Sequence, residues 1–214
     1  MTNTYYRLRL STAGQALTPR QMHRALLSAI PVEFGEHPRA EAKLLWHRET
    51  DGTLIAALRS DLPFHPTRLL GDGLETLTLP EDGNIPVVLN VVRQRSRSIR
   101  GSISQDVRDL LTTSGVDWKR HSRGKLTVVP AGETQEWARA LFARRGLDVS
   151  DDFQAHATGD VLLAAAKDRR ERVPAARITT TLSACQLREL STHGLGRCRN
   201  YGFGLPVPAS FLSK

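Results

Sequence analysis

The first stretch of the chain alternates apolar and polar residues and then changes to helical spacing. Tyr6, Leu8 and Leu10 alternate with polar neighbours, which predicts a half-buried strand. Thr18-Pro19-Arg20-Gln21 follows as a capping box with proline at the first helical position. The apolar residues after it recur at helical spacing: Met22, Ala25, Leu26, Ala29 and Ile30. The pattern predicts a strand and then an amphipathic helix that Pro31 ends.

The rest of the first half predicts strands. Residues 42–48 and 53–59 are short strand-like runs, and the Asp51-Gly52 pair between them favours a hairpin turn. Residues 74–79 alternate again, and a second helix is short or missing before them. The order βαββ(α)β is that of a ferredoxin-like unit.

The second half predicts the same order again. A near-continuous apolar run at 87–92 predicts its first strand. Helices are expected at 105–113 and 133–145, and a third begins at the capping box Ser183-Ala-Cys-Gln186. The strands expected after the first are 147–158, 161–166, 177–182 and 202–207. We therefore predict an α+β protein of two tandem ferredoxin-like (RRM-like, βαββαβ) domains, residues 1–82 and 86–214.

Charge is distributed unevenly between these halves. The 214 residues have a net charge of +8, but residues 1–85 hold 9 basic and 10 acidic side chains, whereas 86–214 hold 21 and 12. Of the 30 cations, 25 are arginine, whose guanidinium binds phosphate with two parallel hydrogen bonds. This composition favours a polyanionic partner held chiefly by the second half. It does not distinguish RNA, DNA and an anionic membrane.

Several classes of protein are disfavoured. No run of about 18 apolar residues is present, so no spanning helix is expected. The first residues lack the apolar core of a signal peptide. With only two cysteines, neither a disulfide framework nor a four-thiolate zinc site is expected. We expect a cytoplasmic protein without a metal or cofactor.

A glycine-rich loop is the most specific local motif. Gly194-Leu-Gly-Arg-Cys-Arg-Asn-Tyr-Gly-Phe-Gly-Leu205 places two Gly-x-Gly pairs around Arg197 and Arg199. Glycines at such a turn allow another backbone to approach and expose N–H groups that can bind phosphate. No Gly-Lys-Ser/Thr follows, so the loop is not a P-loop. A tight helix-to-strand connection with incidental charge remains an equal alternative on composition alone.

This loop at the end of a doubled ferredoxin-like chain resembles that of the CRISPR repeat-processing endoribonucleases of the RAMP superfamily, CasE type. The order of elements in residues 5–31, Pro63-Phe-His-Pro66, residues 137–145 and residues 184–207 supports the resemblance. The resemblance implies cleavage of a repeat hairpin in pre-crRNA without a metal. In that reaction the 2′-hydroxyl attacks the adjacent phosphate and leaves a 2′,3′-cyclic phosphate and a 5′-hydroxyl.

The resemblance also implies a catalytic histidine in the first helix, at His23. Helical spacing places His23 about 90° from the centre of the apolar face, at its border. Arg20 and Arg24 are its sequence neighbours, and we expect them to stabilise negative charge. The family often has a tyrosine where Arg20 stands, so the second catalytic group is open; Tyr5 and Tyr6 on the preceding strand are alternatives. A surface histidine on an amphipathic helix is the simpler interpretation without the resemblance.

Two arginine-rich runs are candidate clamps for the RNA backbone. Together with Gly194, Gly196, Arg197 and Arg199 of the glycine loop, the proposed RNA-binding residues are Arg93, Arg95, Arg97, Arg100, Arg169, Arg170 and Arg172. Each run taken alone is more often a solvated loop. Residues 167–172 are expected to form a loop between two strands.

The implied partners are RNA, namely a CRISPR repeat stem-loop and its crRNA product, and other subunits of a CRISPR effector complex, with no membrane. A non-catalytic RAMP-type RNA-binding subunit of such a complex is the alternative. A generic basic protein that binds DNA or the ribosome is a third interpretation, and it predicts salt-dependent binding without a preference for hairpins.

Overall fold

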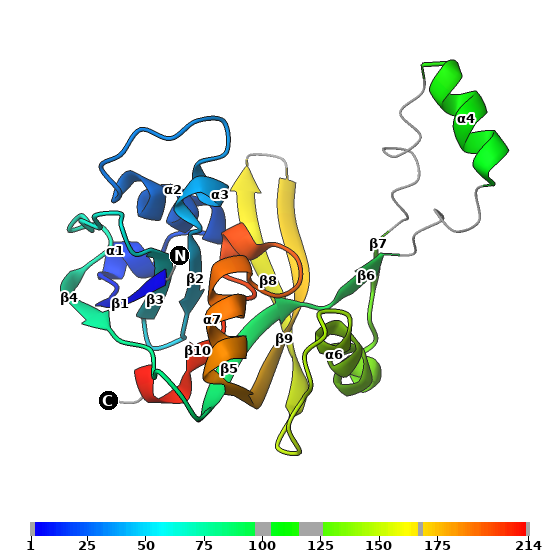
Figure 1. The fold of residues 1–214 in the computed structure, drawn as a ribbon. Helices are drawn as coiled ribbons and strands as arrows, with labels where there is room; N and C mark the ends of the chain where they lie inside the picture. Colours follow the sequence, from blue (N-terminus) through cyan, green and yellow to red (C-terminus); the bar gives the residue numbers. More distant parts are fainter. Residues whose placement is uncertain (1–2, 97–103, 116–125, 167–168, 213–214) are drawn as a thin grey trace.

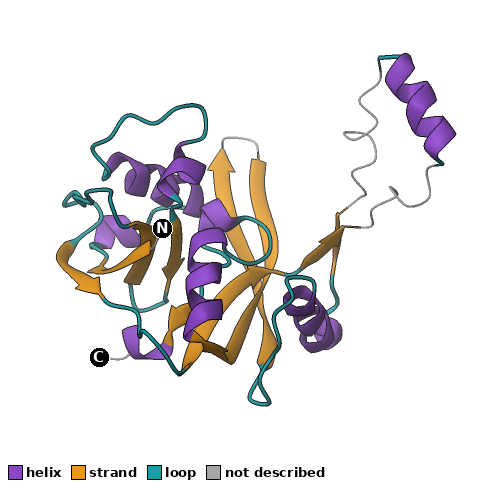
Figure 2. Ribbon diagram, viewed as in Figure 1, coloured by secondary structure: helices purple, strands orange, loops and turns teal. Residues whose placement is uncertain are grey.

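The computed structural model describes residues 3–96, 104–115, 126–166 and 169–212. Its described part contains two four-stranded antiparallel sheets and one two-stranded ribbon. Figures 1 and 2 show the first sheet beside the second, with the ribbon extending away from both. None of the helices in the described ranges is long and apolar enough to cross a membrane.

The first half forms one sheet with helices on one side. Its elements are β1 (Asn3–Arg9), α1 (Thr12–Gln15), α2 (Pro19–Ser28), α3 (Pro38–Ala42), β2 (Leu45–Arg48), β3 (Thr53–Arg59) and β4 (Asp72–Leu77). The strand order β2-β3-β1-β4 is that of a ferredoxin-like unit. The described residues between β3 and β4 form no helix, in line with the expectation of a short or missing second helix.

Helix α2 forms as its sequence predicts. The Thr18 hydroxyl accepts from the backbone N–H of Gln21, and the Gln21 side chain accepts from the backbone N–H of Thr18. This reciprocal pair satisfies two N–H groups that a helix start leaves unpaired. Met22 and Leu26 are fully buried against the first sheet. Burial of one face fixes which residues of α2 face away from its own domain.

The second half repeats the topology. Its elements are β5 (Asn84–Val92), β6 (Gln94–Ser96), α4 (Gln105–Thr113), β7 (Leu126–Val128), the 3₁₀ helix η2 (Ala131–Glu133), α6 (Thr134–Ala143), β8 (Gln154–Ala166), β9 (Arg169–Ser183), α7 (Ala184–His193), η3 (Arg199–Tyr201), β10 (Val207–Pro208) and η4 (Ala209–Phe211). The order β10-β5-β9-β8 is again ferredoxin-like. Helices α6 and α7 cover one face of this sheet.

Three sequence-based boundaries in this half are wrong. The terminal strand expected at 202–207 is β10, which begins only at Val207. The strands expected at 147–158 and 161–166 are the single strand β8, which begins at Gln154. Gly159 has φ +86° and marks a shift of register, so the strand continues through a Gly-Asp pair that reads as a turn. The loop expected at 167–172 is also shorter, because β9 begins at Arg169. Arg169, Arg170 and Arg172 therefore lie on a long hairpin.

The two domains share a buried contact. Tyr5, Leu45, Ile55 and Ala57 on the outer face of the first sheet pack against the C-terminal residues Leu205, Val207 and Phe211. The Tyr5 hydroxyl bonds with Ser191 of α7 at 2.6 Å and donates to the carbonyl of Pro206 at 2.8 Å. Burial raises the pKa of Tyr5 well above its usual range. Tyr5 is thus a buried, hydrogen-bonded residue of the contact between the domains.

An arm projects from the second domain. Strands β6 and β7 form the antiparallel ribbon, and α4 lies beyond it, away from both sheets (Figure 1). The arm leaves apolar side chains exposed: Leu110 is 67% exposed and Val128 55%. These residues contribute little to either core.

Candidate functional site

His23 lies where the first domain meets the glycine-rich loop. Helix α2 packs against η3 and against β8 of the second domain. The half-buried His23 ring meets the Tyr201 ring edge to face, with the ring centres 6.4 Å apart and the planes at 81°. The imidazole therefore faces the second domain, and Tyr201 brings a hydroxyl-bearing ring to it.

The surroundings of His23 disfavour its charged form. Burial and the positive charge of Arg39 lower the pKa of His23 to about 4. Its Nδ1 atom is buried and has no hydrogen-bond partner in the described part of the chain. The imidazole is therefore neutral at pH 7 and able to accept a proton. Arg20 and Arg24 are exposed, so Arg39 is the arginine that acts on His23 electrostatically.

A series of interacting positive charges from both domains begins at Arg39 beside this histidine. Burial and the charge of Arg199 lower the pKa of Arg39, and burial and the charge of Arg145 lower that of Arg199. Arg39 comes from α3, Arg199 from η3 and Arg145 from the turn after α6. Among the described residues none of the three forms an ion pair with a carboxylate. We call Arg39, Arg145 and Arg199 the unpaired cluster.

The glycine-rich loop needs its glycines for close packing. A Cβ on Gly204, at φ +80°, would lie 2.1 Å from the carbonyl oxygen of Leu195, and one on Gly202 would lie 2.6 Å from the Trp46 ring. The Leu195 N–H donates to the Gly204 carbonyl at 2.9 Å, and the Gly204 N–H donates to the Asn90 carbonyl at 2.7 Å. These contacts fix the loop between the two domains.

The first glycine pair does not present free N–H groups as a set. The Gly194 N–H donates to the Leu190 carbonyl at 2.7 Å and so caps α7. Gly194 and Gly196 have φ +67° and +79°, which L side chains rarely adopt. Gly194 therefore sets the path of the loop backbone. The side chain of Arg197, between the two glycine pairs, is exposed to solvent.

The arginines proposed to bind RNA outside the glycine-rich loop differ in how far their charge is exposed to solvent. Arg93 is only 8% exposed and donates from Nη1 to the carbonyl of Val129, so it does not present its charge at the surface. Arg95 is half exposed and lies 3.4 Å from a carboxylate oxygen of Glu133. Arg97 and Arg100 lie outside the described residues. On the β8–β9 hairpin, Arg172 is exposed.

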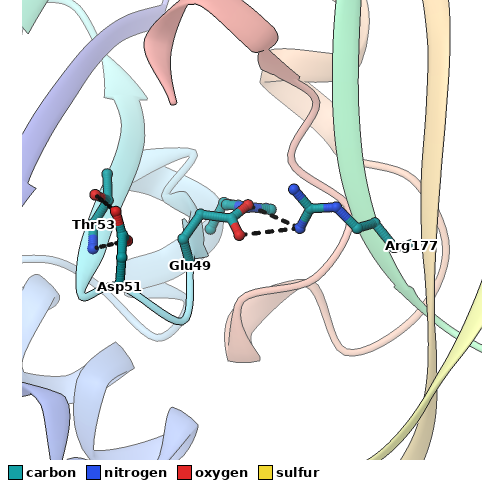
Figure 3. Close-up of polar contacts among 5 residues, drawn as sticks. Glu49, Asp51, Thr53 and Arg177 are labelled. Carbon is teal, nitrogen blue, oxygen red and sulfur yellow. Dashed lines mark hydrogen bonds and ion pairs between the residues drawn. The ribbon is translucent and has the colours of Figure 1, made fainter. Parts of the chain in front are cut away.

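A second cluster lies in a cleft of about 670 Å³ between the β2–β3 turn and the second sheet. Glu49 bonds there to His47 at 2.6 Å and to Arg177 of β9 at 2.9 Å. Figure 3 shows Glu49 pointing across to Arg177 from the other domain. Hydrogen bonding from His47, reinforced by Arg177, lowers the pKa of Glu49 to about 2. The charge of Arg177 is therefore neutralised, and Tyr201 borders the same cleft.

Sequence reasoning missed two residues that lie beside His23. Tyr201 lies inside the glycine-rich motif, and its phenol hydroxyl, a group that can move protons, was the local signal for a candidate site residue. Arg39 follows a proline in a stretch without periodicity, and no local pattern marks it. Among the described residues no group of three metal-binding side chains occurs.

Comparisons with known proteins bear on the fold. No family model and no curated protein matches the sequence. Thermus thermophilus Cse3 bound to an RNA representing a pre-cleavage complex is 16% identical with a TM-score of 0.56, covering 98% of this chain and 100% of that one. The CRISPR-associated protein Cas6e from Escherichia coli K-12 is 11% identical with a TM-score of 0.54, covering 96% and 97%.

A chain of a CRISPR RNA-guided surveillance complex is also similar. It is 18% identical with a TM-score of 0.52, covering 95% of this chain and 98% of that one. The chain therefore shares its fold with these CRISPR proteins over nearly its whole length. The predicted pair of tandem ferredoxin-like domains is confirmed.

Proposed function

We propose that this protein is a metal-independent endoribonuclease that cuts CRISPR repeat hairpins in pre-crRNA. The observation that carries the proposal is the meeting of His23 and Tyr201 across the domain boundary, beside arginines without carboxylate partners. An imidazole, a phenol and fixed positive charge are the groups that transesterification at phosphorus needs. The fold shared with Cse3 and Cas6e supports the same proposal.

His23 acts as general acid or base in this mechanism. The nucleophile is the 2′-hydroxyl of the RNA, so the protein needs only to move protons and stabilise charge. Burial and Arg39 keep free His23 neutral. An incoming phosphodiester brings negative charge, which raises the pKa of the imidazole and improves it as a proton acceptor. Substrate binding thereby prepares the catalytic group.

Tyr201 is the proposed second group. Its hydroxyl can donate and accept a hydrogen bond, which Arg20 at the usual tyrosine position cannot do because guanidinium only donates. Tyr6 packs against Phe64, with ring centres 5.0 Å apart, in the core of the first domain. Of the three tyrosines, Tyr201 is the one in ring contact with His23.

The RNA stem is proposed to lie along exposed cations outside the reaction centre. Arg20 and Arg24 on α2, Arg172 on the β8–β9 hairpin and Arg197 of the glycine loop are exposed. They would bind phosphates of A-form RNA, which proteins read mainly by shape and backbone. The arm, with Arg95 and the exposed side of α4, extends the second domain beyond the two sheets. We propose that the protein stays with its product in an effector complex.

Incubation with repeat hairpins in EDTA tests the function. The wild-type protein should cut once, leaving a 2′,3′-cyclic phosphate and a 5′-hydroxyl. His23→Ala should slow single-turnover cleavage by about 10²–10⁴-fold while binding is kept. His156→Ala, an exposed histidine on β8, is the matched control and should cut normally. Binding without cleavage by the wild-type protein would favour a non-catalytic RNA-binding subunit, and a requirement for Mg²⁺ would contradict the mechanism.

A further inference from the structure

Arg39 is a half-buried cation whose hydrogen bonds are incomplete. Its Nε atom is buried and has no partner in the described part of the chain, as is also true of Nδ1 of the neighbouring His23. A buried donor without an acceptor is unfavourable, because it has lost its hydrogen bonds to water. Folded proteins rarely leave such groups without a reason, and a ligand that completes the bonds is one such reason.

Three other partly buried arginines, Arg59, Arg177 and Arg48, have acceptors that the fold supplies. Arg59 donates to the Asp61 carboxylate and to the Glu41 carbonyl. Arg177 pairs with Glu49, and Arg48 donates to the Leu17 carbonyl at 2.9 Å. Arg93 also has a buried Nε without a partner among the described residues, but its Nη1 donates to the Val129 carbonyl. Arg39 differs from Arg93 because it lies beside His23, whose Nδ1 also has no partner among the described residues, and because Arg199 adds a second positive charge.

Neighbouring charge makes this arrangement less favourable still. Arg39 and Arg199 repel each other, and Arg145 adds a further positive charge next to Arg199. Arg199 is not free to turn away, because its Nη1 donates to the carbonyl of His193 and its Cδ lies against Gly194. Arg39 and Arg199, from different domains, are thus close enough for their charges to interact, and neither forms an ion pair with a carboxylate among the described residues.

The backbone around Arg39 is fixed in advance. The Glu41 carboxylate accepts from the N–H groups of Gly35 and His37 at 2.9 and 3.3 Å, which closes the loop before α3. Arg59 donates to the Glu41 carbonyl at 3.1 Å and ties α3 to the end of β3. Positive charge held in place by such contacts needs no reorganisation when negative charge develops nearby.

We infer that Arg39 and Arg199 together form an anion site that binds the phosphodiester beside His23, with Arg39 as a catalytic residue. The inference rests on the proposed function and deepens it. Each guanidinium offers N–H donors to phosphate oxygens, and the Arg39 Nε–H gains the acceptor it lacks. As the 2′-oxygen attacks, charge grows on the non-bridging oxygens, and two cations stabilise it. The bound anion also offsets the repulsion between the two arginines.

Inorganic phosphate titrated into the free protein at low salt tests the site without any RNA. The ring signals of His23, followed by NMR, should change saturably in the wild-type protein. Arg39→Gln should abolish that response, and Arg39→Lys should keep part of it. Arg68→Gln removes an exposed arginine of the same domain and should leave the response intact. An equal response in Arg39→Gln, or a response that does not saturate in the wild-type protein, would overturn the inference.

Single-turnover cleavage of the repeat hairpin gives the second readout. Arg39→Gln should lower kcat by about 10²–10³-fold, with RNA affinity changed by less than about threefold. Because Arg39 lowers the pKa of His23, its removal should also move the limb of the kcat/KM profile that reports His23 to higher pH. A purely structural role would not move that limb.

The outcomes separate the two proposals. If His23→Ala abolishes cleavage while Arg39→Gln cuts normally, the inference is wrong and the proposed function stands. If phosphate binds through Arg39 but no hairpin is cut, the site is real and the proposed function is wrong. A cleavage loss in Arg20→Gln or Arg24→Gln with none in Arg39→Gln would assign the catalytic cation to α2. Thermal unfolding of Arg39→Gln checks that the variant is folded.

Discussion

The two arginine clusters between the domains differ in whether a carboxylate neutralises them. Arg177 reaches across the cleft to Glu49, which is itself bonded to His47. Arg39 and Arg199 also come from different domains, but Arg39 interacts with a second positive charge, that of Arg199, and with a neutral histidine. The charge of Arg177 in the first cluster is neutralised by the protein itself. The charges of Arg39 and Arg199 in the second cluster are neutralised only when an anion binds.

This difference assigns a separate role to each cluster. A paired, partly buried charge contributes to the association of the domains. An unpaired one lowers the stability of the free protein and binds substrate more strongly for that reason, as is common at functional sites. The residue type is the same in both places, so only the partners decide the role.

The largest effect is expected from breaking the glycine-rich loop that carries Arg199 and Tyr201. Gly204→Ala would place a Cβ 2.1 Å from the Leu195 carbonyl oxygen, and we expect a loss on the order of 3 kcal/mol or more in the free energy of unfolding. Gly146→Ala is the matched control. Gly146 also has positive φ, but its Cβ would meet nothing within 4 Å, so about 1 kcal/mol is expected. Urea unfolding measures both, and equal losses would contradict the packing role of Gly204.

The next largest effect on the free energy of unfolding compares the Glu49–Arg177 pair with the unpaired cluster. Glu49→Gln leaves Arg177 without its carboxylate, so the free energy of unfolding should fall by about 1–3 kcal/mol. Arg39→Gln removes repulsion and should change it by no more than about 0.5 kcal/mol. Parallel urea titrations compare the two variants. A greater loss in Arg39→Gln would show that both clusters are structural.

Stability should depend on pH in two windows. The folded-state pKa of Glu49 is about 2, below its ordinary 4.5, so its contribution is present above pH 4.5 and is lost as the pH falls towards 2. The pKa of folded His23 is about 4, below its ordinary 6.5, so the unfolded chain binds the proton first and stability falls as the pH drops from 6.5 to 4.

Urea midpoints across this range separate the two windows. His23→Ala should remove the loss between pH 6.5 and 4, and Glu49→Gln should remove the loss below pH 4.5. If His23→Ala leaves the upper window unchanged, His23 is not held neutral by its surroundings.

The smallest expected effect is on hairpin binding, when arginines outside both clusters are replaced. Replacing Arg169, Arg170 and Arg172 by alanine should weaken hairpin binding and lower the salt slope by about one for each phosphate that the protein no longer binds. Arg68→Ala removes an exposed arginine of the first domain that lies outside both clusters, and it should leave the slope unchanged. Binding measured over a range of salt concentrations gives both slopes. An unchanged slope in the triple variant would remove the β8–β9 hairpin from the interface.

Local signals predicted the longer helices α2, α4, α6 and α7 and most of the first sheet, but neither α1 nor α3. The capping boxes at Thr18 and Ser183 start α2 and α7 where expected, because a cap is satisfied by residues three positions apart. The start of α3 and the continuity of β8 were missed. Pro38 opens a five-residue helix too short to show a period, and β8 continues through Gly159 because β9 pairs with it on both sides.

The sequence alone determined the doubled ferredoxin-like order, the amphipathic helix that carries His23 and the loop whose glycines permit close packing. These features follow from spacing along the chain, which local hydrogen bonds and burial of one face convert into structure. Only the tertiary structure decided what surrounds His23. Arg39 and Tyr201 lie 16 and 178 positions away in the sequence. Their proximity to His23 results from the packing of two domains, and among the described residues Arg39 forms no ion pair with a carboxylate; no local pattern records either feature.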